Sequence, residues 1–455
     1  MIRALYSLLM WLAQPFLRRK LARRGRVEPG YLVAMEERFG HYAALAPITP
    51  ATTPVAAGAY FWVHAVSLGE TRAAAVLIDS LHKRWPDLHL LLTHGTATGR
   101  TEGATLMRPG DVQVWQPWDT PGNVGRFLQR FQPRIGILME TEVWPDMVAV
   151  CRQQGVPLVL ANARLSEKSL QQSQRLAWLS KPAYRALTAV WAQTDADATR
   201  LRALGAPVRG VMGNIKFDAT PDAALLDRGR AWRKPLARPV VMFASSREGE
   251  EALLLDCLKR NTAPEHTGIA MSATNTVANE IQWLIVPRHP QRFDEVAALI
   301  AGHGFGVSRR SGWGAEVPGA GSMDSMNTDA MKPTIWLGDS LGEMPLYYGL
   351  ADVVLLGGSF EPLGGQNLIE AAACGCPVIM GPHTFNFLQA SELAEEGGAA
   401  QRVQTMAQAV AATRSLVSDG EALASQRRAT ATFAMAHRGA VDRTVAAIAD
   451  LLHQQ

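Results

Sequence analysis

Short apolar runs alternate with longer amphipathic stretches over most of the chain. Between residues 60 and 212, runs that suit buried strands occur at 60–66, 88–93, 112–115, 135–139, 158–161, 189–192 and 208–212. The stretches between them, such as 70–84, space their apolar residues as helices do. This alternation is typical of a parallel sheet with helices on both faces.

The same pattern begins again after a break at residues 217–238, which contain Pro221 and Pro235 but no strand pattern. We therefore predict an α/β protein with two doubly wound, Rossmann-like domains, 27–216 and 239–455, joined by a linker at 217–238. Ligands of such domains bind at the carboxyl ends of the strands, so we expect a site in a cleft between the two domains. The residues from 404 onward are rich in alanine and are predicted to be helical. The strand candidates of the second half are 240–244, 283–286, 306–309, 334–337, 353–356 and 378–380.

The overall composition is that of a folded protein, with two local exceptions. Of the 455 residues, 47% are hydrophobic and 19% are charged. The low-complexity stretches 261–280 and 311–332 are predicted to be mobile surface insertions. The net charge of +4 is too small to indicate nucleic acid binding. Four cysteines without a paired framework favour a reducing compartment.

The N-terminus combines an apolar run with a basic one. Residues 4–17 are almost entirely apolar, and six basic residues follow between 18 and 26. A membrane-spanning helix needs about 20 apolar residues, so this run is short, and whether it spans the bilayer or lies in its interface stays open. We predict that residues 1–26 form an apolar helix that attaches the chain to the cytoplasmic side of the inner membrane. The alternative is an amphipathic helix packed on its own domain.

Three residues of the first half stand where strands end and the chain can face a ligand. Glu70 follows a Ser/Gly loop after the first strand candidate and opens a helix. Glu140, followed closely by Glu142, ends the run at 135–139, and Lys216 comes just after the last strand candidate. A crowded carboxylate can act as a general base. The alternative for the glutamates is that they only cap a helix or complement its dipole, and a single lysine is usually just solvated.

In the second half, four loops between a strand and a helix could bind an anion. Ser245 and Ser246 follow the first strand candidate, and Pro287 and Arg288 follow the next. Arginine binds phosphate or carboxylate with two hydrogen bonds. The loop at 338–343 contains Leu341, Gly342 and Glu343. A glycine-rich loop begins at 357 and runs into a helix, and we expect it to bind a nucleotide through its candidate residues Gly365, Asn367, Leu368, Ile369 and Glu370.

The sequence predicts no metal site and no resident cofactor. Neither H-E-x-x-H nor C-x-x-C occurs, and the D-x-D of residues 195–197 is better explained as the capped start of a helix. No G-x-x-x-x-G-K-[ST] motif is present and no G-x-G-x-x-G opens the chain, which disfavours ATP hydrolysis and nicotinamide chemistry.

Seven motifs, in order between residues 64 and 387, resemble those of one family. They read HAVSLGE, METEVWP, GNIKFD, VPRHP, GDSLGE, GGSFEPLGGQNLIE and GPHTFNF. This set is similar to the Kdo (3-deoxy-D-manno-oct-2-ulosonic acid) transferases of lipopolysaccharide assembly. The resemblance implies a GT-B fold, CMP-Kdo as donor, lipid IVA as acceptor, and inverting transfer without a metal.

The resemblance also implies roles for individual residues. Glu70 corresponds to the catalytic base, and Glu140 and Lys216 correspond to groups that stabilise the transition state. The CMP site falls on residues 287–288, 341–343 and 367–370. Two departures affect the donor contacts: Gln366 stands where the family has histidine, and residues 245–250 read SSREGE rather than an STHEGE-like start. The alternatives are another GT-B enzyme, such as an epimerase or a UDP-sugar transferase, and a non-catalytic sugar-nucleotide-binding protein.

Overall fold

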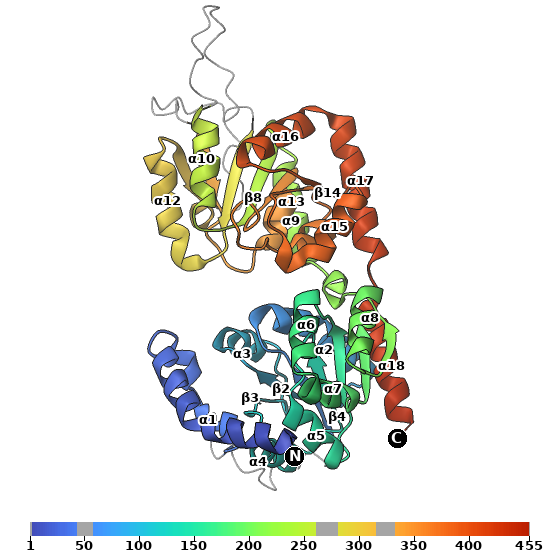
Figure 1. The fold of residues 1–455 in the computed structure, drawn as a ribbon. Coiled ribbons are helices and arrows are strands. Elements are labelled where there is room, and N and C mark those ends of the chain that lie inside the picture. Colours follow the sequence, from blue (N-terminus) through green and yellow to red (C-terminus); the bar gives the residue numbers. More distant parts are fainter. Residues whose placement is uncertain (1, 43–57, 261–280, 315–332, 455) are drawn as a thin grey trace, which may run out of the picture. The chain divides into compact units, whose positions relative to one another are not determined.

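The computed structural model describes residues 2–42, 58–260, 281–314 and 333–454. These residues form two compact units, each built around its own parallel sheet (Figure 1). Unit 1 comprises Met1–Asp218 and His437–Gln455, and unit 2 comprises Ala219–Ala436. The stretch 261–280 and most of 311–332 lie outside the described residues, so the prediction of two surface insertions stays a prediction.

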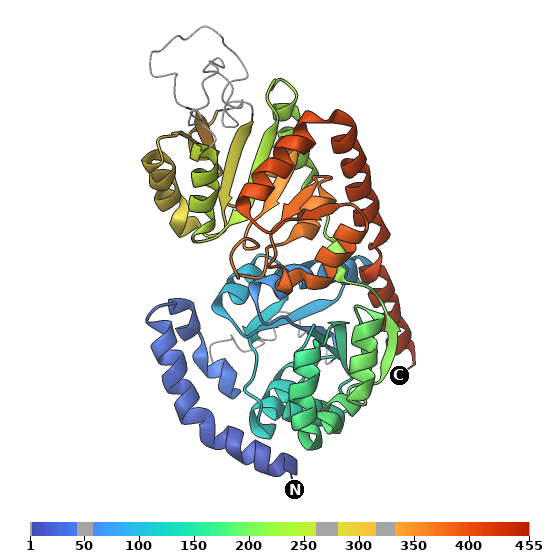
Figure 2. The ribbon, with the colours of Figure 1, turned by 45° about the horizontal axis from the view of Figure 1, so that its top comes forward.

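The sheet of unit 1 has seven parallel strands in the order β3-β2-β1-β4-β5-β6-β7. Most of the strand residues are buried, because helices cover both faces of the sheet (Figure 2). All seven strands predicted in this half are confirmed, with ends that differ by up to two residues. The strands are β1 (Tyr60–His64), β2 (His89–His94), β3 (Val112–Trp115), β4 (Ile135–Met139), β5 (Leu158–Ala163), β6 (Ala189–Ala192) and β7 (Val208–Val211). The helices between them are α2 (Leu68–Arg84), α3 (Ala97–Ala104), α4 (Pro121–Phe131), α5 (Pro145–Gln153), α6 (Glu167–Arg175), α7 (Ala177–Arg185) and α8 (Asp195–Ala203).

The sheet of unit 2 also has seven parallel strands, in the order β10-β11-β9-β8-β12-β13-β14. The six predicted strands are confirmed, whereas the short edge strand β14, with the sequence Ala-Gln-Arg, has no apolar pattern that predicts it. The strands are β8 (Val240–Ser246), β9 (Gln282–Pro287), β10 (Gly306–Arg309), β11 (Thr334–Leu337), β12 (Val353–Leu356), β13 (Val378–Met380) and β14 (Ala400–Arg402). The main helices are α9 (Ala223–Arg233), α10 (Glu250–Arg260), α12 (Phe293–Gly302), α13 (Met344–Leu350), α14 (Leu368–Ala373), α15 (Leu388–Glu396), α16 (Met406–Ser418) and α17 (Gly420–Ala436).

The predicted linker at 217–238 carries a helix that belongs to unit 2. Helix α9 packs tightly on α13, and a glycine on each helix makes this possible. A Cβ atom on Gly229 would lie 2.1 Å from the carbonyl oxygen of Leu346, and one on Gly349 would lie 2.4 Å from that of Leu226. Only glycine allows the two backbones to approach so closely. Unit 2 therefore begins directly after Asp218.

The prediction that residues 239–455 form one domain is wrong at its C-terminal end. Helix α18 (Ala440–His453) returns to unit 1 and packs on α2 (Figure 1). Its apolar face is buried in the core of unit 1, and the carboxylate of Asp218 accepts hydrogen bonds from the main-chain N–H groups of Gly439 and Val441 at its start. An amphipathic pattern predicts a helix but not which core covers it. The buried residues of this face are Ala440, Val441, Val445, Ile448, Leu451 and Leu452.

The predicted N-terminal helix is present as α1 (Ile2–Gly25), which runs along the outside of unit 1 (Figure 2). Tyr6 donates a hydrogen bond of 2.8 Å to Asp119, and Ser7 donates one of 2.7 Å to Asp146, beside the start of α5. Across the described ranges, no helix is both long and apolar enough to cross a bilayer. Large apolar side chains nevertheless stay exposed on α1, namely Ile2, Leu5, Leu8, Leu9, Trp11, Leu12 and Phe16.

Candidate functional site

The strand order places the candidate residues at one point of each sheet. In unit 1 the chain winds outward from β1 toward β3 on one side and from β4 toward β7 on the other. In unit 2 the corresponding reversal lies between β8 and β12. Neighbouring loops diverge at such a switch point and leave a crevice at the carboxyl ends of the strands, where α/β proteins bind ligands. Glu70 and Glu140 follow β1 and β4, and the two glycine-containing loops of unit 2 follow β8 and β12.

Glu70 lies in a capped helix start whose surroundings alter its acidity. Ser67 is the N-cap of α2, and its hydroxyl donates to Glu70 Oε1 at 3.1 Å, while Val66 N–H donates to Oε2 at 2.9 Å. Ser67 Oγ in turn accepts a long hydrogen bond of 3.5 Å from Glu70 N–H, so the two residues cap the start of α2 in the manner of a capping box, with Val66 N–H in place of the N-cap N–H. Burial is nevertheless the main cause that raises the pKa of Glu70 to about 7, and the nearby carboxylates of Glu140 and Glu142 add to it. A carboxylate with a pKa near 7 suits a general base.

Glu140 is almost completely buried, at 3% exposure, and is held by two cations. Lys216 Nζ lies 2.8 Å from Glu140 Oε1, and Arg164 Nε lies 3.1 Å from Oε2. The backbone of Glu140 adopts a left-handed conformation with φ 59°, which is uncommon outside glycine and typical of strained functional positions. The predicted residues Glu140 and Lys216 are therefore brought into direct contact.

Asn162, at the end of β5, fixes the segment that carries Lys216. Its side-chain Oδ1 accepts a hydrogen bond of 3.0 Å from Ile215 N–H, next to Lys216 in the sequence. Asn162 is 1% exposed and has a left-handed φ of 51°. Asn162 and Arg164 were missed by the sequence analysis, although both come directly after the predicted strand 158–161, as Glu140 comes after 135–139. A search for polar residues directly after the predicted strand 158–161 would have found them.

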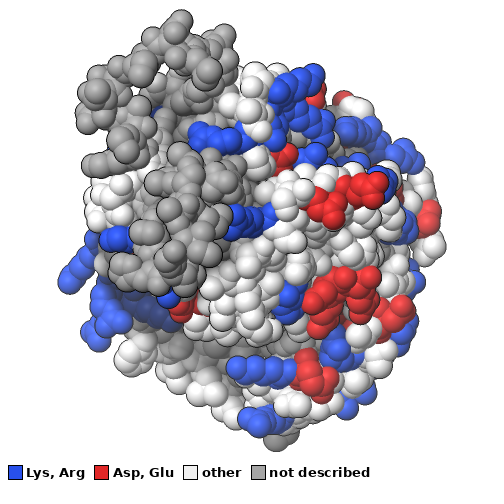
Figure 3. Space-filling model, turned by 90° about the horizontal axis from the view of Figure 1, so that it is seen from above, with Lys and Arg blue, Asp and Glu red and all other residues white. Residues whose placement is uncertain are grey.

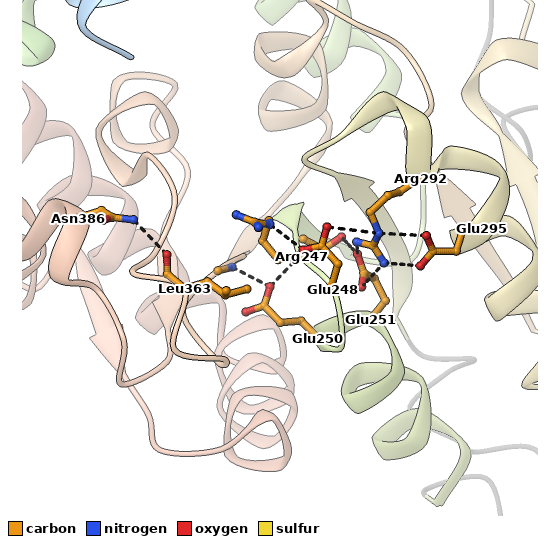
Figure 4. Close-up of polar contacts among 10 residues, drawn as sticks. Arg247, Glu248, Glu250, Glu251, Arg292, Glu295, Leu363 and Asn386 are labelled. Carbon is orange, nitrogen blue, oxygen red and sulfur yellow. Dashed lines mark hydrogen bonds and ion pairs between the residues drawn. The ribbon is translucent and has the colours of Figure 1, made fainter. Parts of the chain in front are cut away.

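In unit 2, a network of buried carboxylates supports the loop after β8 (Figure 4). Ser246 is 0% exposed, and its hydroxyl donates to Glu251 Oε1 at 2.7 Å, so only its main chain could meet a ligand. Glu251 also forms a buried ion pair of 2.8 Å with Arg292. Ser245 and Ser246, which were predicted to follow the strand, are the last two residues of β8, and Ser245 has a left-handed φ of 54° at an irregularity of the strand. Arg288 N–H donates to Ser246 O at 3.0 Å, which ties the loops after β8 and β9 together.

The glycine-rich loop after β12 is fixed by segments on either side. Gly364 has φ 91°, and a Cβ atom there would lie 2.4 Å from Asn386 Nδ2. Asn386 Nδ2 donates to Leu363 O at 3.1 Å and its main-chain N–H donates to Gly364 O at 2.9 Å (Figure 4). The motif GPHTFNF, which contains Asn386, therefore clamps the loop. Gly365 has φ 74°, so both glycines occupy conformations that other residues rarely adopt.

The remaining candidate residues of unit 2 differ in what they could offer a ligand. Asn367 is the N-cap of α14, and its Oδ1 accepts from Ile369 N–H at 3.2 Å. The side chains of Leu368 and Ile369 are 1% and 3% exposed, so only their main chains could contact a ligand. Pro287 is buried at the end of β9, and Glu370 is partly exposed one turn into α14.

The loop after β11 holds the last three candidates. Leu341 is 73% exposed, and Gly342 has φ 77°. Glu343 pairs with Arg310 Nη2 at 2.8 Å, so its charge is already balanced. The loops after β11, β9, β8 and β12 follow adjacent strands, and the candidate residues of unit 2 therefore share one edge of its sheet.

Comparison with known proteins decides the family. The family described as 3-deoxy-D-manno-octulosonic-acid transferase matches residues 34–219. A 3-deoxy-D-manno-octulosonic acid transferase of Bordetella pertussis is 42% identical over 456 residues, covering 99% of either chain. The chain belongs to the Kdo transferase family. A Kdo transferase of Haemophilus influenzae is 30% identical over 97% of either chain.

Solved structures of other proteins support the fold of this Kdo transferase. A UDP-GlcNAc 2-epimerase of Neisseria meningitidis matches 86% of this chain and 100% of its own, with a TM-score of 0.55 and 13% identity. A glycosyltransferase of Rickettsia africae matches 87% of this chain and 98% of its own, with a TM-score of 0.52 and 12% identity. At such identities the likeness concerns the fold alone. The predicted GT-B class, with two parallel α/β units, is confirmed at this level.

Proposed function

We propose that this Kdo transferase moves Kdo from CMP-Kdo to lipid IVA at the inner membrane surface, with inversion and without a metal. The observation that carries the proposal is the contrast between two glutamates of unit 1. Glu70 has a pKa raised to about 7, whereas Glu140 is fixed between Lys216 and Arg164. Two carboxylates in different environments are suited to different tasks in one reaction.

Glu70 is the proposed base. It takes the proton from the attacking hydroxyl of the acceptor, whose oxygen then bonds to the anomeric carbon of Kdo as the bond to the phosphate oxygen of CMP breaks. Displacement from the opposite side inverts the configuration. Glu140 and Lys216 are proposed to act on the transition state, where the sugar becomes cation-like and the leaving CMP gains negative charge. The ion pair with Lys216 keeps the Glu140 carboxylate ionised and in one orientation.

Unit 2 is proposed to bind the donor. Arg288 is proposed to donate hydrogen bonds to the phosphate and to the sugar carboxylate, together with main-chain N–H groups of the loops after β8, β11 and β12 other than those of Arg247, Gly358 and Phe360. Glu370, one turn into α14, is proposed to accept hydrogen bonds from the ribose hydroxyls. The replacement of the family's histidine by Gln366 retains a polar side chain next to this turn.

Helix α1 is proposed to lie in the membrane interface on the cytoplasmic side. Its first turns are docked on unit 1 through Tyr6 and Ser7, yet large side chains such as Trp11 and Phe16 are 61% and 70% exposed. Arg19, Lys20 and Arg23 are exposed as well. Apolar side chains beside basic ones suit a surface of anionic lipids. On the described part of the face drawn in Figure 3, by contrast, basic and acidic side chains lie among uncharged ones.

The test of the reaction is mass spectrometry of lipid IVA after incubation with the purified protein and CMP-Kdo. We expect the lipid to gain the mass of one or more Kdo residues. A parallel reaction with UDP-GlcNAc in place of CMP-Kdo distinguishes the donors. Transfer from UDP-GlcNAc, or unchanged lipid with CMP-Kdo at high enzyme concentration, would contradict the proposal.

The test of the membrane role is flotation with vesicles that contain anionic lipids. The variant Trp11→Glu should reduce the bound fraction several-fold, because it places a charge at the apolar interface. Met435→Glu is a matched control, since Met435 is 66% exposed in α17 of unit 2. Equal flotation of Trp11→Glu and the parent protein would refute interfacial binding by α1.

A further inference from the structure

Glu250 connects the two loops at the switch point of unit 2. It is the first residue of α10 and is 0% exposed. Its Oε2 atom accepts hydrogen bonds from Arg247 N–H at 2.9 Å and from Gly358 N–H at 2.7 Å, and its Oε1 atom accepts from Phe360 N–H at 2.9 Å. One carboxylate therefore binds main-chain groups of the loop after β8 and of the loop after β12 (Figure 4).

The hydrogen bonds of Glu250 connect two loops that the strand pairing of the sheet does not hold together. Strands β8 and β12 are neighbours up to Ala244 and Leu356, and beyond these residues the regular pairing of the two strands ends. Loops past a strand end are usually mobile, and glycines such as Gly358, with φ 69°, add freedom. Hydrogen bonds to an ionised carboxylate are about twice as strong as neutral ones. Glu250 thus replaces the missing pairing with three strong bonds.

Burying an ionised carboxylate costs free energy unless its hydrogen bonds or ion pairs compensate for the lost hydration. The neighbouring Glu251 satisfies this requirement with the cation of Arg292, as in an ordinary buried ion pair. Glu250 instead uses main-chain N–H groups from two different loops. Its burial therefore serves to fix these loops to each other.

We propose that Glu250 is a positioning residue for the donor: it holds the loops at 245–249 and 357–365 in the geometry that binds CMP-Kdo, without touching the donor itself. This inference rests on the proposed donor site of unit 2. A pre-organised site spends no binding energy on ordering its loops. Loosening them should therefore weaken donor binding and leave the chemical step of the bound donor nearly unchanged.

The test variant is Glu250→Gln. An amide has one oxygen, which accepts hydrogen bonds, and one NH2 group, which only donates them. The oxygen can accept from the N–H groups on one side of the side chain, and the NH2 group then faces an N–H on the other side, where no hydrogen bond can form. We expect the Kd for CMP and the KM for CMP-Kdo to rise about tenfold or more, in line with the loss of one or two charge-assisted bonds. The kcat should stay within about threefold, and the KM for lipid IVA should not change.

Asp352→Asn is the matched control. Asp352 is also buried in unit 2, at 5% exposure, and accepts a hydrogen bond of 2.9 Å from Val240 N–H, besides its ion pairs with Arg233 and Arg427. It lies before β12 and therefore at the opposite edge of the sheet from the donor loops. Asp352→Asn should lower the thermal stability without raising the KM for CMP-Kdo. An equal rise in KM for both variants would show general destabilisation and overturn the proposal.

Two further variants keep the proposal falsifiable. Asn386→Ala removes the side-chain clamp at Leu363 O and should raise the KM for CMP-Kdo several-fold, even if Glu250→Gln does not fold. Arg288→Ala tests the proposed donor site itself. If Arg288→Ala weakens CMP binding and neither Glu250→Gln nor Asn386→Ala does, the positioning role fails alone. If Arg288→Ala also binds CMP normally, the donor site has been assigned wrongly.

Discussion

Replacing Glu70 by glutamine separates its catalytic role from its structural one. In the capping box, the amide oxygen of glutamine can accept from Val66 N–H as Oε2 does now, and its NH2 group can stay beside Ser67. Glutamine cannot take a proton from the acceptor hydroxyl. We expect kcat to fall about 10²–10⁴-fold. This corresponds to about 2.7–5.4 kcal/mol of activation free energy.

The same substitution should not lower the free energy of unfolding. The pKa of Glu70 rises from 4.5 to about 7 in the folded protein, so between these values the folded state binds more protons than the unfolded state. Stability therefore falls as the pH rises through this window, by at most about 3.4 kcal/mol. Because Glu70 is only partly buried, we expect the stability of the parent protein to fall by about 1–2 kcal/mol across this window. Glu70→Gln does not suffer this loss of stability at high pH. It does remove a negative charge at the start of α2, which offsets about 0.3–1 kcal/mol of that advantage.

The assay combines transfer kinetics with urea unfolding at pH 5 and pH 8. The parent protein should show kcat/KM rising with pH up to about 7 and level above it, and Glu70→Gln should lose activity at every pH while being equally or more stable at pH 8. Glu142→Gln is the control for kcat, since this carboxylate is also half-buried and its bond from Trp144 Nε1 can be kept by the amide oxygen. Because the Glu142 carboxylate helps to raise the pKa of Glu70, this variant should move the pH profile toward lower pH and keep the maximal kcat. Activity of Glu70→Gln within tenfold of the parent, or a fall in activity that merely follows a fall in stability, would refute the reasoning.

Three further predictions concern the contacts around the site. Lys216→Met leaves the buried Glu140 with one cation instead of two. It should lower the free energy of unfolding in urea by about 3 kcal/mol and lower kcat at least 100-fold. An unchanged kcat would contradict the role of the lysine. Asn162→Ala should lower the free energy of unfolding by about 2–4 kcal/mol, because it removes a buried hydrogen bond and places alanine at a left-handed φ. The kcat should also fall, because Lys216 is misplaced. A normal kcat would show that Asn162 does not position Lys216. Gly364→Ala should raise the KM for CMP-Kdo, whereas Gly375→Ala, which has the same type of φ but open space around it, should only lower the melting temperature; equal KM values would show that the loop tolerates a side chain.

Most of the sheet could be predicted from the sequence, for a simple reason. Parallel strands covered on both faces are apolar at nearly every position, so runs such as 135–139 stand out from the amphipathic helices around them. Strand β14, with a polar sequence at the sheet edge, lacks this signal. The destination of α18 depends on a core that forms from distant residues, which periodicity does not encode.

The candidate site was predictable as a set of residues but not as a set of contacts. Glu140 and Lys216 were both placed in the site because they follow strands. Their ion pair depends on the short helix at Ile215–Asp218, which Asn162 draws toward β5. Strand order decides which strand ends are neighbours, and it cannot be read from one sequence. The roles of Arg164 and Glu250 likewise appear only once their partners are placed.

The return of α18 to unit 1 has a consequence for synthesis on the ribosome. Unit 2 consists of 218 consecutive residues, counted from Ala219 to Ala436, and they must all be made before α18 appears. At about 5–20 residues per second, the first 218 residues wait roughly 10–45 s for the helix that completes their core. During this interval the apolar surface that α18 later covers is open to chaperones or to other nascent chains. A stop codon near residue 437 would therefore damage the half of the protein that was made first.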